Sequence, residues 1–256
     1  MYRLTARLAE PDFEMQLYPD GVPVWGPGTT AAVLVKVDRA HGLNSDIQLQ
    51  IEGLPEGWVS RPAVTIAQTP ERPGSSYYNY FGLRTFLTIT APATAKPGDL
   101  AAFRIVGRTT HNGRNLERIA RPLTWYYSSD IGFFRTSSQA RVAVARPQGP
   151  WLTTAVTELT AAPGEKVEIP VEVHNAGQDA SIGLVVNLAT AGVACGYNPP
   201  ASIPIRNGIA TVTLTVTPET PPGEFYLTVA RTWASDIRNG MPGPCTPLIK
   251  LNVRAK

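Results

Sequence analysis

The sequence predicts an all-β protein made of two β-sandwich domains in tandem, and three observations support this prediction. Short segments rich in Val, Ile, Thr and Leu are separated by turns along the whole chain, which contains 24 prolines and 22 glycines. Short strands between Gly and Pro turns are typical of sandwiches and barrels. No segment shows the i, i+3, i+4, i+7 apolar spacing of an amphipathic helix. The two halves of the chain also repeat one order of turns and strands.

Strand periodicity is clearest after the turn Pro163-Gly164. Apolar residues alternate there with glutamates, namely Val167, Ile169, Val171 and Val173 with Glu168 and Glu172. This period of two predicts a half-buried strand. A second alternating segment follows the equivalent turn Pro27-Gly28 in the first half.

The two halves correspond again further along the chain. Apolar segments lead through a Pro-Gly turn into another apolar strand in both halves: residues 86–92, 97–98 and 103–106, then residues 213–218, 222–223 and 225–229. An Asn-Gly pair follows in each half, Asn112-Gly113 and Asn239-Gly240. Agreement in order as well as in residue type predicts a duplicated unit.

The boundary between the units is expected near residues 146–150, which gives domains 1–146 and 147–256. Each domain has room for about seven strands, the number typical of an immunoglobulin-like sandwich. The first domain is longer because of two insertions, residues 68–82 and 125–140.

Asn-Gly pairs predict hairpin turns, because both central positions of a type I′ turn need a positive φ. If Asn207-Gly208 forms such a turn, the flanking residues pair as Arg206 with Ile209, Ile205 with Ala210, and Ile203 with Val212. One face is then apolar and the other carries threonines: Ile203, Ile205, Ala210, Val212, Leu214 and Val216 opposite Thr211, Thr213 and Thr215. The turn and the alternation independently predict the same core face.

A short motif in the first half resembles a known kind of domain. The turn Leu54-Pro55-Glu56-Gly57-Trp58 follows a predicted strand, and Thr-Ala-Pro with a later Pro-Gly, within residues 90–98, precedes another. This combination is similar to bacterial immunoglobulin-like domains associated with carbohydrate-binding modules and to cell-adhesion-related domains of bacterial surface proteins. The resemblance covers residues 27–105, whereas the second half has residues 191–196 where the first has the Pro-Glu-Gly-Trp turn.

The resemblance implies an accessory β-sandwich within a long secreted protein, acting as a spacer, a scaffold or a weak binding surface. It implies no catalytic residues. The chain also lacks the Gly-x-Ser-x-Gly, His-Glu-x-x-His and phosphate-loop signatures. We therefore expect no enzyme and no cofactor, with an autonomous hydrolase using paired carboxylates as an alternative.

A resident metal is not expected either. The three histidines, His41, His111 and His174, lie in or before turns and lack metal-ligand spacing. Calcium at the domain junction stays open as an alternative, because several aspartates lie beside turns: Asp38, Asp46, Asp130, Asp179 and Asp236.

The net charge of +3 is modest, and we expect no nucleic-acid partner. Arginines do gather in one segment with Glu117 among them: Arg104, Arg108, Arg114, Arg118 and Arg121. We expect solvent-facing residues of one hairpin there, with a basic patch as the alternative. No apolar run is long enough for a membrane span, and the N-terminus lacks the apolar core of a signal peptide. A piece of a longer exported protein is therefore expected, located outside the cell, on its surface or in the periplasm.

The two cysteines, Cys195 and Cys245, both lie in the second half. Two cysteines in one domain of an exported protein predict a structural disulfide worth about 2–4 kcal/mol. Two unpaired cysteines are the alternative.

A ligand site, if present, is expected in the first insertion, where Tyr77, Tyr78 and Tyr80 lie in a loop that the second half lacks. Tyrosine rings suit stacking on a sugar face or on a partner protein. Trp58 belongs to the turn motif and is expected to cap the core. The leading functional hypothesis is a non-catalytic structural, adhesive or spacer segment of a larger exported bacterial protein, with other domains of that protein as partners. The alternative is a carbohydrate- or protein-binding accessory module of a secreted hydrolase.

Overall fold

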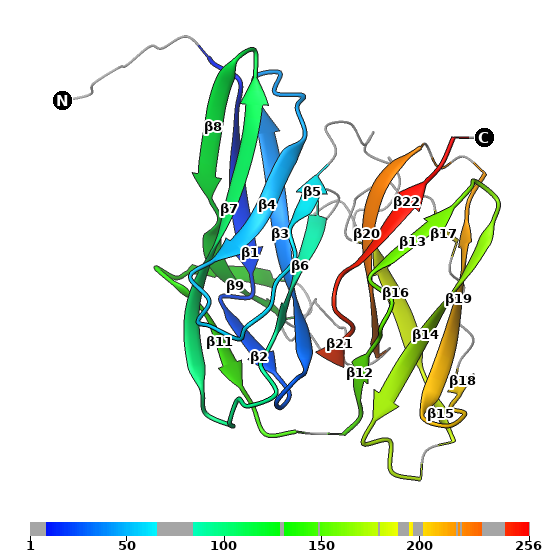
Figure 1. Ribbon diagram of the computed structural model, residues 1–256. Coiled ribbons are helices and arrows are strands. Elements are labelled where there is room, and N and C mark those ends of the chain that lie inside the picture. Colours follow the sequence, from blue (N-terminus) through cyan, green and yellow to red (C-terminus); the bar gives the residue numbers. More distant parts are fainter. Residues whose placement is uncertain are drawn as a thin grey trace.

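The computed structural model describes residues 9–65, 84–128, 131–147, 149–178, 180–188, 195–196, 202–218, 220, 222–231 and 244–255. Within these residues the regular secondary structure is entirely β, with no helix, which confirms the all-β prediction (Figure 1). The strands form sheets of ten, six, four and two strands.

The described strands of the first half belong to two sheets. They are β1 (Asp12–Tyr18), β2 (Gly21–Val24), β3 (Thr30–Ala40), β4 (Ile47–Glu52), β5 (Ala63–Thr65), β6 (Arg84–Thr90), β7 (Leu100–His111), β8 (Arg114–Ile119), β9 (Arg121–Ser128), β10 (Ile131–Thr136) and β11 (Ala140–Val144). Strands β1, β3, β6, β9 and β10 belong to the ten-stranded sheet and the others to the six-stranded sheet. Strand β3 lies between β1 and β6, and β7 is paired with β4, β8 and β11. The sheets approach closely where β7 crosses β1, because a Cβ placed on Gly107 would lie only 2.6 Å from Met15 Sδ.

The second half has shorter strands. They are β12 (Trp151–Thr153), β13 (Glu158–Ala161), β14 (Lys166–His174), β15 (Ser181–Ile182), β16 (Leu184–Leu188), β17 (Cys195–Gly196), β18 (Ile203–Pro204), β19 (Ile209–Val216), β20 (Gly223–Arg231), β21 (Pro244–Cys245) and β22 (Ile249–Val253). Strand β14 lies between β12 and β19, and β20 lies between β16 and β22.

The two halves share a pairing scheme. In the first, β1 is antiparallel to β3, after which the chain crosses over and β2 runs parallel to the last strand, β11. In the second, β12 is antiparallel to β14, after which β13 runs parallel to the last strand, β22. The central pairs also correspond, β3 with β6 and β14 with β19. In each half, the first two strands therefore lie in different sheets: β1 and β2 in the first half, and β12 and β13 in the second.

The expected alternation of β14 and β19 is confirmed. In β14, Ile169, Val171 and Val173 are buried, while Glu168 and Glu172 are exposed. In β19 the alternate residues Ala210, Val212, Leu214 and Val216 are fully buried. The threonines between them are exposed or half-buried. Sequence periodicity therefore identified the core face of both strands.

The Asn-Gly turns at 112–113 and 207–208 are also confirmed, whereas Asn239-Gly240 lies outside the described residues and one expected register is wrong. Asn207 and Gly208 have φ values of 51° and 77°, and Arg206 and Ile209 exchange backbone hydrogen bonds of 2.8 and 2.9 Å. Beyond the turn the expected pairing of Ile205 with Ala210 and of Ile203 with Val212 is wrong. Ile203 pairs with Ile182, and the Ile205 N–H donates to the Ala180 carbonyl. Strand β19 takes β14 as its partner instead, which supplies a longer ladder.

The second expected insertion forms a hairpin. Strands β9 and β10 pair antiparallel from Leu123 to Thr136, and β9 begins parallel to β1 at Gln16 and Arg121. The first insertion, residues 68–82, lies outside the described residues.

Buried apolar side chains form two clusters. One is built mainly from β1 to β11 and includes Phe13, Leu49 and Ile105, and it is joined by four residues of the second half: Tyr226, Ala230, Cys245 and Leu248. The other is built from β12 to β22 and includes Leu152 and Leu214. Along the chain, Val144 is the last first-half residue of the first cluster and Leu152 is the first residue of the second cluster.

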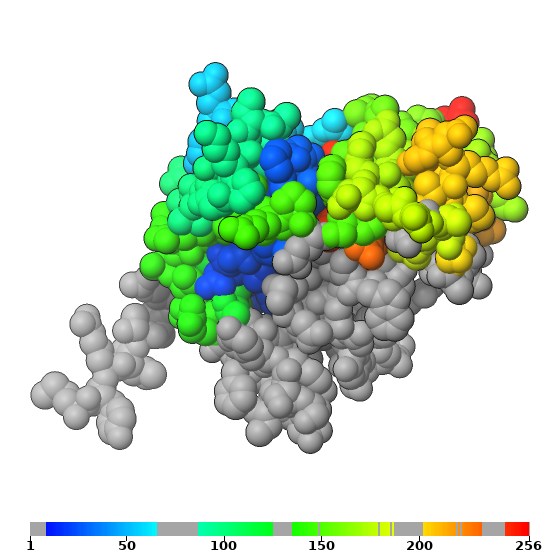
Figure 2. Space-filling view, turned by 90° about the horizontal axis from the view of Figure 1, so that it is seen from below, coloured from blue at the N-terminus to red at the C-terminus, as the bar shows by residue number. Residues whose placement is uncertain are grey.

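The two halves meet through a strand. Pairing of β1 with β3 stops at Leu34, which leaves the first residues of β3 uncovered on that edge. Strand β21 of the second half pairs there, Pro244 with Ala31 and Cys245 with Thr30, and it also pairs with β20. One ten-stranded sheet therefore runs through both halves, and Figures 1 and 2 show the halves in contact.

Candidate functional site

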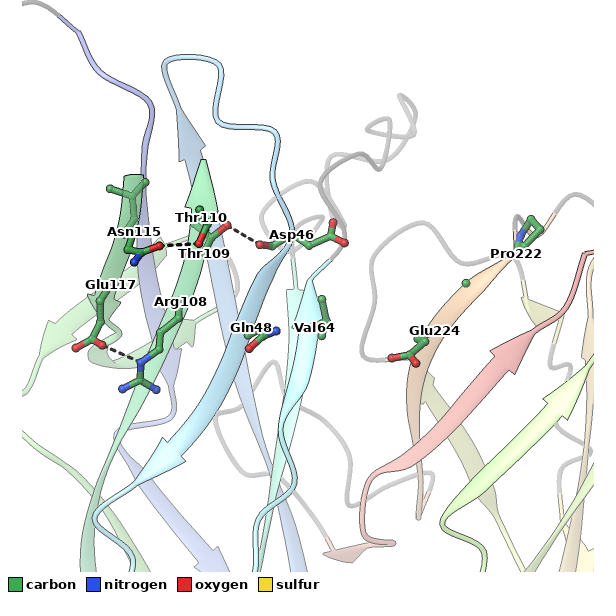
Figure 3. A pocket seen from close by; sticks show the side chains of 12 residues that line it. Asp46, Gln48, Val64, Arg108, Thr109, Thr110, Asn115, Glu117, Pro222 and Glu224 are labelled. Atoms are coloured by element: carbon green, nitrogen blue, oxygen red, sulfur yellow. Dashed lines mark hydrogen bonds and ion pairs between the residues drawn. The ribbon is translucent and has the colours of Figure 1, made fainter. Parts of the chain in front are cut away.

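A groove of about 980 Å³ lies between the two halves (Figure 3). The first half contributes one wall, from strands β4, β5, β7 and β8 and from Asp46 just before β4. The second half contributes the start of β20 and the residue before it, Pro222, Gly223 and Glu224. Segments more than one hundred residues apart in sequence therefore line one cavity.

Strand pairing places the polar residues of the first wall in rows. Gln48 of β4 is opposite Arg108 of β7, and Arg108 is opposite Glu117 of β8. In the next row Thr110 is opposite Asn115, and the Thr110 hydroxyl donates to Asn115 Oδ1 at 2.7 Å. Cross-strand neighbours on one face stand close enough for their side chains to interact. The wall is thus a surface of amides, hydroxyls and charged groups.

Arg108 is fixed within this wall by two carboxylates. Its Nη2 lies 2.6 Å from Glu52 Oε1, and its Nε lies 2.8 Å from Glu117 Oε2. Hydrogen bonds to Glu52 and then to Glu117 raise the pKa of Arg108, and hydrogen bonds from Arg108 and Arg104 lower the pKa of Glu52. The side chains of Arg108 and Glu117 are exposed and that of Glu52 is half-buried, so these ion pairs contribute to side-chain orientation more than to stability.

Glu224 on the opposite wall is also paired. Lys250 Nζ lies 2.5 Å from Glu224 Oε1, and this hydrogen bond raises the pKa of Lys250. The Tyr226 hydroxyl donates to Glu224 Oε2 at 3.4 Å, and burial, followed by the charge of Glu224, raises the pKa of Tyr226. The charges of both walls are therefore largely balanced within the protein.

Four of the five arginines expected in one hairpin lie in it, and Arg121 does not. Arg104, Arg108, Arg114 and Arg118 lie on β7 and β8 with exposed side chains, and each is paired with a carboxylate: Arg104 and Arg108 with Glu52, Arg114 with Glu10, and Arg118 with Asp12. Arg121 is exposed at the start of β9. Alternating charge of this kind differs from the continuous basic surface typical of nucleic-acid binding.

The tyrosines proposed as a ligand site, Tyr77, Tyr78 and Tyr80, lie outside the described residues. Trp58 is half-buried and packs against the first core cluster, as expected for a cap. The two parts of the turn motif lie together, because a Cβ on Gly57 would be 3.2 Å from Pro92 Cβ. The motif therefore serves packing of the fold in this region.

The predicted disulfide is not formed. Cys245 is a free, buried cysteine, and its sulfur lies 3.8 Å from the Thr30 carbonyl of the first half. Cys195 is on β17, which pairs with β19 in the four-stranded sheet, whereas Cys245 is on β21 in the ten-stranded sheet. Strand β21 turns toward β3, so position 245 belongs to the junction between the halves.

The histidines and aspartates form no metal cluster within the described residues. His41 adopts a positive φ in a turn, and His111 Nδ1 lies 2.9 Å from Ser45 Oγ. His174 stacks on Trp151 with ring centroids 5.4 Å apart. Of the aspartates considered for calcium, Asp38 pairs with Lys36 and Asp46 lines the groove, whereas Asp130, Asp179 and Asp236 lie outside the described residues.

No protein-family model matches the chain, and a sequence search of curated proteins returned no significant match. Within the described part of the chain, no helix has the length and apolar character needed for a membrane span.

Sequence reasoning missed the groove. One signal was available, because alternation in β4 exposes Gln48 and Gln50 on the face opposite the buried Leu49. The position of Glu224 across the groove from Gln48 could not be predicted from the sequence, because it depends on how the two halves pack.

We expect Cys245 to be unreactive in the folded protein. Burial raises the pKa of its thiol from 9.0 to about 12, so the reactive thiolate is scarce at pH 8. Ellman's reagent should react slowly with a Cys195→Ser variant and rapidly after denaturation. Prompt labelling of the native variant would contradict this expectation.

The same shift has a consequence for stability at alkaline pH. A thiol whose folded pKa is raised stabilises the folded state fully below pH 9, and this contribution is lost as pH rises toward about 12. The urea midpoint should therefore fall less between pH 8.5 and 10.5 in a Cys245→Ala variant than in the parent chain. An equal fall in both would contradict the assignment.

Proposed function

We propose that the chain is a non-catalytic structural segment of a larger exported bacterial protein, consisting of two tandem immunoglobulin-like sandwiches. The shared pairing scheme supports a duplicated unit, because each half has its first two strands in different sheets and ends with a parallel pair. The turn motif around Trp58 supports the exported setting through its resemblance to bacterial accessory domains. In this role the partners are the neighbouring domains of the parent protein.

One observation carries the proposal: β21 joins the two halves by main-chain pairing. Two further hydrogen bonds hold this contact, from Arg61 Nη1 to the Leu248 carbonyl at 3.0 Å and from the Leu248 N–H to Thr88 Oγ1 at 3.2 Å. Tandem domains connected only by a linker move relative to each other. Strand pairing across the junction opposes such motion, and a spacer that sets a fixed angle between its neighbours needs this property.

The distance between the halves tests the proposal. Spin labels at Gln50→Cys and Thr213→Cys lie on exposed positions of the first and second halves, in a Cys195→Ser background. A single narrow distance distribution by pulsed electron paramagnetic resonance is expected for a stiff spacer. A broad distribution would overturn the proposal, since it would mean that the halves reorient freely.

An accessory binding role is the second candidate, for carbohydrate or for protein, beside a hydrolase of the same parent. The polar groove between the halves favours it, because ligand sites occur preferentially between domains.

A further inference from the structure

The groove between the halves has unused hydrogen-bonding groups. The side chain of Gln48 is exposed and makes no hydrogen bond with any described residue, and Asn115 uses its Oδ1 but not its Nδ2 in the described contacts. Both amides stand on paired strands, so their positions are fixed by the sheet. Each planar amide can donate and accept at once, which matches two neighbouring hydroxyl groups.

The charge of the lining selects against ionic ligands. Arg108 is already paired with two glutamates, and Glu224 is already paired with Lys250. A polyanion would need unpaired cationic side chains, and a polycation would need unpaired carboxylates. The ion pairs within the protein reduce the number of both kinds of group. A neutral ligand with many hydroxyl groups meets no such obstacle.

The dimensions and apolar content of the groove fit the same class of ligand. A volume of about 980 Å³ is at the upper end of the range of ligand sites, roughly 300–1,000 Å³. Val64 and Pro222 add apolar surface to the lining, against which the C–H faces of sugar rings can pack. Because the groove is open to solvent, a sugar chain can enter it from the surface.

We infer that this groove binds a neutral polysaccharide, held between β4, β7 and β8 of the first half and the start of β20 in the second. Gln48 and Asn115 hydrogen-bond its hydroxyl groups, and Arg108, oriented by Glu52 and Glu117, adds a fixed donor. The inference rests on the two-unit arrangement of the proposed function and assigns it a ligand class. It also explains why a polar surface remains uncovered at the junction.

Affinity electrophoresis of the full chain provides the test, in gels containing soluble β-glucan, galactomannan or xylan, with polygalacturonate as the polyanion. At least one neutral polysaccharide should retard the protein. Gln48→Ala should weaken that retardation about five- to tenfold, through loss of one or two hydrogen bonds. Glu224→Ala should weaken it too, because the second wall contributes.

Gln50→Ala is the matched control, since Gln50 is exposed on the same face of β4, two residues away, and does not line the groove. It should change the retardation less than twofold, and unchanged melting temperatures of the variants show that all are folded. No retardation by any neutral polysaccharide overturns the inference, as do equal effects of the Gln48 and Gln50 variants or a preference for polygalacturonate. A narrow label distance together with absent binding rejects the ligand but leaves the spacer role standing.

Discussion

Replacing Cys245 with aspartate is expected to separate the two halves of the molecule. Position 245 is 1% exposed and lies between β3 of the first half and β20 of the second. A carboxylate there would be desolvated and would face the Thr30 carbonyl oxygen, which accepts hydrogen bonds and offers none. Such a charge costs several kcal/mol. Separation of the halves at the junction returns the carboxylate to water. The desolvation cost is therefore removed by opening the junction.

The measurement is small-angle X-ray scattering combined with limited proteolysis. The variant should have a larger radius of gyration than the parent chain and faster cleavage between the halves. Thr213→Asp is the control, because Thr213 is exposed on β19 and accepts a charge without burial. Cys245→Ser tests the same site with a milder polar group and should give a smaller expansion. If all these variants scatter like the parent, β21 does not hold the halves together.

Truncation of Leu214 to alanine is expected to destabilise the second half by about 2–5 kcal/mol. Leu214 is fully buried in the second cluster, so the substitution removes apolar contacts and leaves a cavity. For a unit of this size the loss corresponds to a fall in melting temperature of about 10 °C or more. Thr213→Ala, at the exposed neighbouring position, should change it little.

Hydrogen exchange shows whether the effect stays within one half. Amides of β14 and β19 should lose protection in the Leu214→Ala variant, while those of β4 and β7 keep theirs. Leu49→Ala, in the first cluster, should give the reverse pattern. Equal loss of protection throughout both halves in either variant would show a single cooperative unit and would contradict two separate cores.

Much of the fold was predictable from local sequence. The alternation in β14 identified the residues that face the core, and the Asn-Gly pair at 207–208 identified a turn, because both features depend on neighbours along the chain. The arginine-rich hairpin was predictable for the same reason, since β7 and β8 are adjacent in sequence. The all-β class followed from these short-range rules together.

Long-range partners were not predictable in this way. A strand edge offers the same backbone groups to any other strand, so periodicity did not show that β19 would pair with β14 rather than continue its own hairpin. The expected disulfide failed for the same reason, because the two cysteines were assigned to one domain before the partner of β21 was known.

The sequence by itself determined the strands, their turns and the faces that are buried, because these depend on side-chain alternation and on backbone conformations available to Asn and Gly. Only the tertiary structure decided the junction. The first residues of β3 have a free edge because the chain leaves β1 at Tyr18 and continues as β2 in the other sheet. Strand β21, more than two hundred residues later, pairs with the backbone groups of this edge. The same packing places Glu224 across from Gln48, so the groove exists only once both halves have folded and paired.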